Sequence, residues 1–111
     1  MDFYSYQEIS RRTLHMNDNQ NLTVSNLAMG LAGESGEVVD YLKKIYHHGH
    51  ILNKQKIMDE LGDVLWYVSS LAYVHDIDLE EVAEYNIEKL EKRYPSGFSH
   101  EKSKNRSEGG E

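Results

Sequence analysis

A long apolar segment in the second half of the sequence places the strongest limit on the fold. Residues 64–68, Val-Leu-Trp-Tyr-Val, are apolar without interruption, and residues 71–74, Leu-Ala-Tyr-Val, follow closely. Ile57 and Leu61 continue the pattern upstream at helical spacing, which predicts a helix over about 53–75. A surface helix needs one apolar stripe, but this helix is apolar nearly all round. We therefore expect a second copy of the chain to cover it; the alternative is a helix sandwiched between other helices of the same chain.

The rest of the chain also indicates an all-α protein. Its only proline, Pro95, lies near the end, and apolar residues recur at helical spacing before it. The predicted helices cover about residues 4–16, 23–46, 53–75 and 78–94. The residues expected to form the apolar stripe of the first helix are Tyr6, Ile9, Thr13 and Leu14. Gly49 is expected to end the second helix. Asp78 and Glu81 resemble a capping box at the start of the fourth helix, which Pro95 should stop.

Length and composition indicate a single domain. The chain has 111 residues, which is below the roughly 150 residues of a typical domain. A compact globule of this length has a radius of gyration of about 13 Å. Residues 99–111 are polar and lack helical periodicity. We expect one helical domain over residues 1–98 and a flexible polar tail over residues 99–111.

Charge and residue usage exclude several classes of protein. The chain carries 12 basic and 19 acidic residues, a formal charge of −7. This charge disfavours binding to nucleic acid polymers or anionic membranes through bulk electrostatics. Because cysteine is absent, disulfides, zinc–thiolate sites and iron–sulfur clusters are excluded. Neither a signal peptide nor an apolar run long enough to span a membrane is visible, so we expect a cytoplasmic protein.

Two pairs of carboxylates are candidates for a site. Glu34 and Glu37 lie three residues apart in the second predicted helix, and Glu60 and Asp63 do so in the third. Side chains at this spacing lie on one face of a helix. If the two helices pack antiparallel through their short connection, all four carboxylates face one another. The alternative is that each pair lies on an ordinary solvated helix face.

Facing carboxylates repel one another and therefore need cations, protons or buried partners. A site made only of oxygen ligands prefers hard ions, which makes Mg²⁺ the first choice and Mn²⁺ the second. Mg²⁺ commonly bridges to phosphate groups, so an acidic protein can bind a polyphosphate through it. The two pairs contain no histidine, which argues against the Glu-x-x-His pattern of a di-iron bundle.

Four glycines lie inside the same two helices, at Gly30, Gly33, Gly36 and Gly62. Each costs about 1 kcal/mol relative to alanine in a helix interior. These costs indicate a gain elsewhere, either close packing between helices or room for a ligand against the backbone.

Together these motifs resemble the MazG-like nucleotide pyrophosphohydrolases of the all-α NTP pyrophosphatase superfamily. The resemblance covers about residues 4–106. It rests on Gly-Glu-Ser-Gly-Glu at 33–37, His-Gly-His at 48–50, Glu-Leu-Gly-Asp-Val-Leu-Trp-Tyr at 60–67 and Arg-Tyr-Pro at 93–95. It implies a four-helix bundle assembled with another copy, as a homodimer or homotetramer. It also implies Mg²⁺-dependent cleavage of an NTP or dNTP to the monophosphate and pyrophosphate.

The resemblance also suggests roles for individual residues. The positions that match the family's metal ligands are Glu34, Glu37, Glu60 and Asp63. One of them would activate a water molecule, and Glu34 is the preferred candidate. Tyr67 matches a position that contacts substrate in dCTP-cleaving relatives. The residues that match positions near the phosphates or sugar are Lys43, Asn86, Lys89 and Arg93.

Two other functions stay open at this point. One is a specialised relative, such as a dUTPase-like enzyme or a phosphoribosyl-ATP hydrolase, because the carboxylates alone do not select a base. The other is a non-catalytic helical module that binds nucleotide or metal. The presence of all four carboxylates argues against the non-catalytic module.

Overall fold

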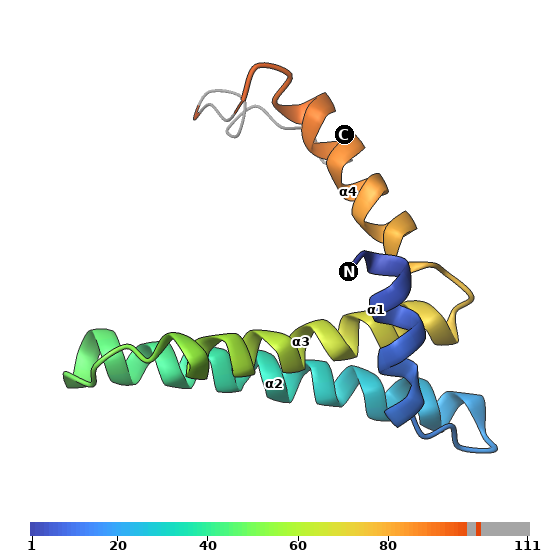
Figure 1. Cartoon of the computed structure of the whole chain (residues 1–111), viewed down its shortest axis with the longest axis horizontal. Coiled ribbons are helices and arrows are strands. Elements are labelled where there is room, and N and C mark those ends of the chain that lie inside the picture. The colour runs from blue at the N-terminus through green and yellow to red at the C-terminus, as the bar shows by residue number, and fades with distance from the viewer. Residues whose placement is uncertain (98–99, 101–111) are drawn as a thin grey trace.

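In the part of the chain that the structure describes, four α-helices and one short 3-10 turn are the named elements. The computed structural model describes residues 1–97 and residue 100, so the predicted tail over 99–111 lies outside the described residues apart from His100. The elements are α1 (Phe3–Ser10), η1 (Arg11–Thr13), α2 (Gln20–His48), α3 (Lys54–Val74) and α4 (Leu79–Arg93) (Figure 1). These described residues form no β-strand, which confirms the predicted all-α class. None of the described helices is long and apolar enough to cross a membrane.

The ends of the helices follow local capping. The side chain of Asn19 accepts a hydrogen bond from the Asn21 backbone N–H at 2.9 Å, so α2 begins slightly earlier than the sequence predicts. Gly49 ends α2 as predicted, in the left-handed region at φ 75°. The capping box predicted for α4 is also present, because the Asp78 backbone N–H donates to Glu81 Oε2 at 2.9 Å.

The helices α2 and α3 lie antiparallel along most of their length (Figure 1). At one end, the side chain of Gln20 donates a hydrogen bond to the backbone carbonyl of Val74 at 3.0 Å. Between the two ends, Gly30 lies against the ring of Tyr67 so closely that a Cβ atom at residue 30 would be 2.8 Å from Tyr67 Oη. Gly30 therefore permits the close approach of the two helices, which is one of the reasons predicted for the glycines.

A buried glutamine holds α1 against the corner between α3 and α4. The Gln7 side-chain amide donates to the backbone carbonyls of Ser69 at 3.3 Å and Ile77 at 3.1 Å, and its oxygen accepts from the Leu79 backbone N–H at 3.2 Å. Gln7 is only 4% exposed, whereas Ile9, which the helical pattern placed on the apolar face, is exposed. The buried face of α1 therefore differs from the predicted one.

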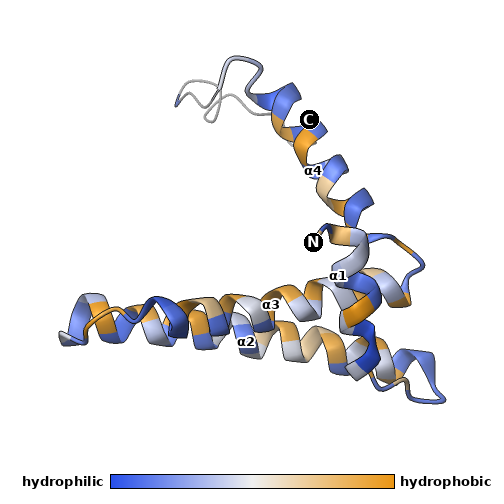
Figure 2. Cartoon of the chain, viewed as in Figure 1, coloured by the Kyte–Doolittle hydropathy of each residue, from blue (hydrophilic) through white to orange (hydrophobic). Residues whose placement is uncertain are grey.

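The four helices do not close into a bundle within one chain. The start of α4 contacts α1 and α3, and its far end points away from the α2–α3 pair (Figure 1). Few apolar residues are buried in the described part of the chain: Leu27, Ala72 and Leu79. Apolar segments also recur along the open parts of α2, α3 and α4 (Figure 2). The predicted bundle would therefore need helices from outside the chain, and the assembly stays a prediction.

Candidate metal centre

Three of the four predicted carboxylates converge between α2 and α3. Glu34 comes from α2, and Glu60 and Asp63 come from α3; one ligand oxygen from each lies within 4.8 Å of the others. We call these three residues the acidic cluster. Glu37 does not belong to it and is exposed one turn further along α2. Three of the four carboxylates therefore face one another as the sequence predicts. The role of Glu37 as a metal ligand stays a prediction.

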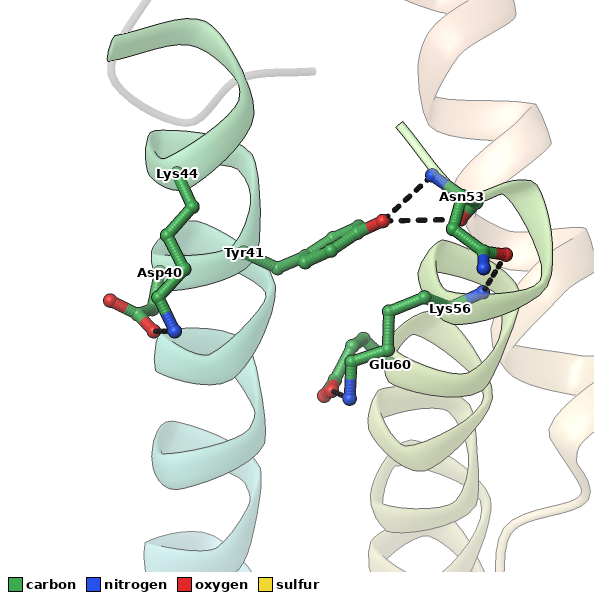
Figure 3. A network of polar contacts seen from close by, with 6 residues as sticks. All are labelled: Asp40, Tyr41, Lys44, Asn53, Lys56 and Glu60. Atoms are coloured by element: carbon green, nitrogen blue, oxygen red, sulfur yellow. Dashed lines mark hydrogen bonds and ion pairs between the residues drawn. The ribbon is translucent and has the colours of Figure 1, made fainter. Parts of the chain in front are cut away.

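The connection between α2 and α3 fixes which acids face each other. The Tyr41 hydroxyl, from α2, accepts a hydrogen bond from the Asn53 backbone N–H at 2.8 Å and donates to the Asn53 carbonyl at 3.3 Å (Figure 3). Asn53 in turn caps α3, because its side chain accepts from the backbone N–H groups of Gln55 and Lys56. Two turns beyond this anchor, Glu34 lies opposite Glu60.

Burial and crowding make the acidic cluster electrostatically unfavourable without a cation. Glu60 is a buried carboxylate, only 7% exposed. The pKa of Glu34 is raised above its ordinary value, mainly by desolvation and then by the negative charges of Asp63 and Glu60. Carboxylate oxygens that destabilise one another in this way suit a hard divalent ion such as Mg²⁺, which takes oxygen ligands and supplies the missing positive charge.

The structure adds a residue that the sequence interpretation missed. Lys56 Nζ lies 2.7 Å from Glu60 Oε1, one turn before it on α3 (Figure 3). The spacing of four residues from Glu60 was a signal for this contact, since side chains at that spacing meet on a helix. The hydrogen bond to Glu60 and the charge of Glu60 raise the pKa of Lys56, which keeps it positively charged.

Helix α1 brings a second missed residue, Tyr6, close to the acidic cluster. Partial burial, followed by the negative charge of Asp63, raises the pKa of the Tyr6 hydroxyl. Tyr6 also lines an open hollow of about 310 Å³, whose wall is formed by Met1, Phe3 and Leu65 and by two acidic residues, Asp2 and Glu80. The hollow thus offers an aromatic surface with two carboxylates at its edge.

The residues matched to substrate contacts are scattered within one chain. Tyr67 lies one turn after Asp63 on α3, and its ring packs on Gly30 and, edge to face, on Trp66. Lys43 is exposed on α2. The other three lie on α4, which points away from the α2–α3 pair (Figure 1): Asn86, Lys89 and Arg93. Their contacts with substrate stay predictions.

Three of the interior glycines have no packing explanation within the chain. A Cβ atom added at Gly33, Gly36 or Gly62 would meet nothing within 4 Å, in contrast to Gly30. The space beside the three glycines is available to a ligand or to a second copy.

Trp66 has a structural role, because its indole N–H donates to the Ser10 carbonyl and to Thr13 Oγ1.

Comparisons with known proteins give a family match and one similar protein. Residues 22–98 match the family model of the MazG nucleotide pyrophosphohydrolase domain, a stretch that contains all four predicted carboxylates. The "Gene 37 protein" of Mycobacterium phage L5 is 41% identical over 78 residues, which cover 67% of this chain and 68% of the phage protein. No solved structure gives a significant match.

Proposed function

Because this chain belongs to the MazG nucleotide pyrophosphohydrolase family, we propose that it hydrolyses nucleoside triphosphates, NTP or dNTP, with Mg²⁺ as the preferred ion and Mn²⁺ as a substitute. Water adds across the bond between the α- and β-phosphates, and the products are a nucleoside monophosphate and pyrophosphate. The observation that carries this proposal is the convergence of Glu34, Glu60 and Asp63. We expect the enzyme to act in the cytoplasm.

Each member of the acidic cluster has a role in this proposal. Glu34, Glu60 and Asp63 would hold the metal ion from two sides, because they come from two helices. When bound, Mg²⁺ neutralises charge on the triphosphate and lowers the pKa of a water molecule. The carboxylates also provide acceptors for the proton that the attacking water loses, and Glu34 stays the preferred one.

An aromatic hollow next to the acidic cluster supports a nucleotide as substrate. A nucleotide needs a charged site for its phosphates and an apolar surface for its base. Tyr6 links the two parts in this proposal. Its ring lines the hollow of about 310 Å³ beside Phe3 and Leu65, and partial burial and then the negative charge of Asp63 raise the pKa of its hydroxyl. The stacking of a base on one of these aromatic rings would leave the phosphates directed toward the acidic cluster.

The proposal includes a second copy of the chain, because the single chain is extended and exposes a large surface. The chain has a radius of gyration of 17.0 Å, against about 13 Å for a compact globule of this length. It exposes 8432 Å², against about 6300 Å² for a compact protein of its mass. The excess is larger than the roughly 800 Å² that each partner buries in a standard interface. We therefore propose a homodimer or homotetramer, in which α4 and the open sides of α2 and α3 are covered.

Substitutions in the acidic cluster test the activity. Asp63→Asn and Glu60→Gln keep the shape of each side chain but remove its charge, so both should reduce turnover by at least about a hundredfold. Asp59→Asn is the matched control, because Asp59 precedes Glu60 but lies outside the acidic cluster. The assay measures pyrophosphate and monophosphate by ion-exchange chromatography over a panel of NTPs and dNTPs.

The panel also separates the alternatives. A rate for dUTP far above the rates for the other nucleotides would identify a dUTPase-like relative. Turnover of phosphoribosyl-ATP, added to the panel as a further substrate, would identify a phosphoribosyl-ATP hydrolase. Nucleotide or metal binding without turnover would identify a non-catalytic module and contradict the proposed activity. Near-normal activity in both Asp63→Asn and Glu60→Gln would contradict the assignment of the site.

A further inference from the structure

The contact between Lys56 and Glu60 suggests how the protein maintains the acidic cluster before a metal ion binds. We propose that Lys56 is a resident counter-ion of Glu60, and that a divalent cation displaces its ammonium group when it binds the acidic cluster. This inference rests on the proposed function only in that the acidic cluster binds a divalent cation. Lys56 is a positioning residue in this account, because it acts through Glu60.

Burial makes Glu60 dependent on a positive partner. Its side chain is 9% exposed, so water stabilises its negative charge poorly. Glu34 and Asp63 lie within 4.8 Å and add further negative charge. Lys56 Nζ, at 2.7 Å from Glu60 Oε1, supplies the one positive charge that the described structure gives Glu60 in an ion pair.

The two partners differ in their freedom to leave the contact. The side chain of Lys56 is 48% exposed, so its ammonium group can move into water while its aliphatic part stays on the helix. Glu60 cannot follow, because it is buried between the helices. A lysine that precedes a glutamate by four residues is also the weaker of the two orders on a helix. The ion pair therefore depends on the burial of Glu60 and not on favourable helix geometry.

A divalent ion and the ammonium group compete for the same carboxylate. The Lys56 ammonium group donates to Glu60 Oε1, which is an oxygen of a predicted metal ligand. Two cations on either side of one carboxylate repel each other in a partly buried site. A divalent ion would carry twice the charge of the ammonium group and could be held by three carboxylates, so an excess of the ion would displace Lys56 from Glu60. Release of Lys56 should therefore accompany metal binding.

The test measures the affinity of the protein for Mn²⁺ in the absence of nucleotide. The electron paramagnetic resonance signal of free Mn²⁺ reports how much of the ion is bound. Lys56→Met removes the charge and keeps the aliphatic stem, and it should tighten the dissociation constant by about threefold to tenfold. Lys56→Arg keeps the charge and should stay close to wild type. Lys44→Met is the matched control, because Lys44 also makes an ion pair across four residues, with exposed Asp40 at 3.1 Å (Figure 3), and should leave Mn²⁺ affinity unchanged.

Thermal unfolding gives a second, independent measurement. Without metal, Lys56→Met leaves the buried Glu60 carboxylate unpaired, so its melting temperature should fall below that of wild type. In saturating Mn²⁺ the difference should shrink, because the ion then partners Glu60. The increase in melting temperature on adding Mn²⁺ is thus larger in Lys56→Met than in wild type or Lys44→Met.

The outcomes distinguish this inference from the proposed function. Unchanged or weaker Mn²⁺ binding in Lys56→Met, with normal binding in wild type, would overturn the displacement and leave the metal site intact. Wild type that binds no Mn²⁺ would overturn the metal site and the inference together. Tighter binding in Lys56→Met but not in Lys44→Met or Lys56→Arg is the result that supports displacement.

Discussion

The close contact between Gly30 and Tyr67 predicts that an added methyl group at residue 30 destabilises the protein relative to the same change at other helix glycines. In Gly30→Ala the new Cβ atom would lie 2.8 Å from Tyr67 Oη and closer still to two ring carbons, Cε1 and Cζ. Carbon atoms pack best at about 3.5–4.0 Å, so the ring would have to move by more than about 1 Å. The ring is held edge to face against Trp66, with 4.9 Å between centroids, and cannot move without disturbing that contact.

Two matched variants isolate the cost of this clash. Alanine at an exposed glycine in a helix interior gains about 1 kcal/mol from helix propensity. In the monomer, Gly36→Ala and Gly62→Ala should show that gain alone, because nothing in the described chain lies within 4 Å of their added Cβ atoms. Gly30→Ala receives the same gain but loses about 1–3 kcal/mol to overpacking. The difference between Gly30→Ala and the controls therefore equals the cost of the clash.

Thermal unfolding by circular dichroism measures this difference in metal-free protein. One kcal/mol corresponds to about 4–8 °C in a domain of this size. Gly30→Ala should therefore melt at least about 4 °C below both Gly36→Ala and Gly62→Ala. If Gly30→Ala melts at the same temperature as the controls or above it, the helices do not approach as described and the reasoning is refuted.

Three further predictions follow from the packing and the charges. Gln7→Leu should lower the free energy of unfolding by about 2 kcal/mol or more, because the Ile77 carbonyl and the Leu79 N–H lose their hydrogen bonds to the Gln7 side chain. Urea unfolding that matches wild type would contradict this. The pKa of Glu34 is raised in the folded protein, so the free energy of unfolding without metal should fall as pH rises from about 4.5 through the native pKa. Glu34→Gln should make this dependence on pH shallower in urea unfolding with EDTA, and equal dependence in both proteins would contradict the prediction. Leu61 is 52% exposed in a single chain, so Leu61→Gln should convert an oligomer to monomer in light scattering; a monomeric wild type would refute the proposed assembly.

Residues that act along one helix, or between two adjacent ones, could be predicted from the sequence. Spacing of three residues placed Glu60 and Asp63 together on α3, and a short connection predicted that Glu34 would face them. Local chemistry likewise predicted the end of α2 at Gly49 and the capping box at the start of α4. Each of these features depends on a few neighbouring residues, which is why the sequence pattern sufficed.

Features that depend on distant contacts could not be predicted in the same way. Gln7 orients α4 through backbone groups more than sixty residues away, and its polar side chain gives no sign of burial in a helical pattern. The same pattern favoured Ile9 as a buried residue, although Ile9 is exposed. The spacing of glycines also did not distinguish Gly30, which packs on Tyr67, from Gly36, which faces open space. Only the placement of the partner element decides these cases.

The central claim is the cleavage of the bond between the α- and β-phosphates, and ³¹P NMR tests it most directly. The protein is incubated with a mixture of NTPs and dNTPs in Mg²⁺, and Asp63→Asn serves as the inactive control. We predict that the triphosphate signals decline while monophosphate and pyrophosphate form in equal molar amounts, with no change in the control. The pyrophosphate signal should then have twice the area of the monophosphate signal, because pyrophosphate carries two phosphorus atoms. Growth of diphosphate and inorganic phosphate, or triphosphate signals that stay unchanged with the wild-type protein, would contradict the account.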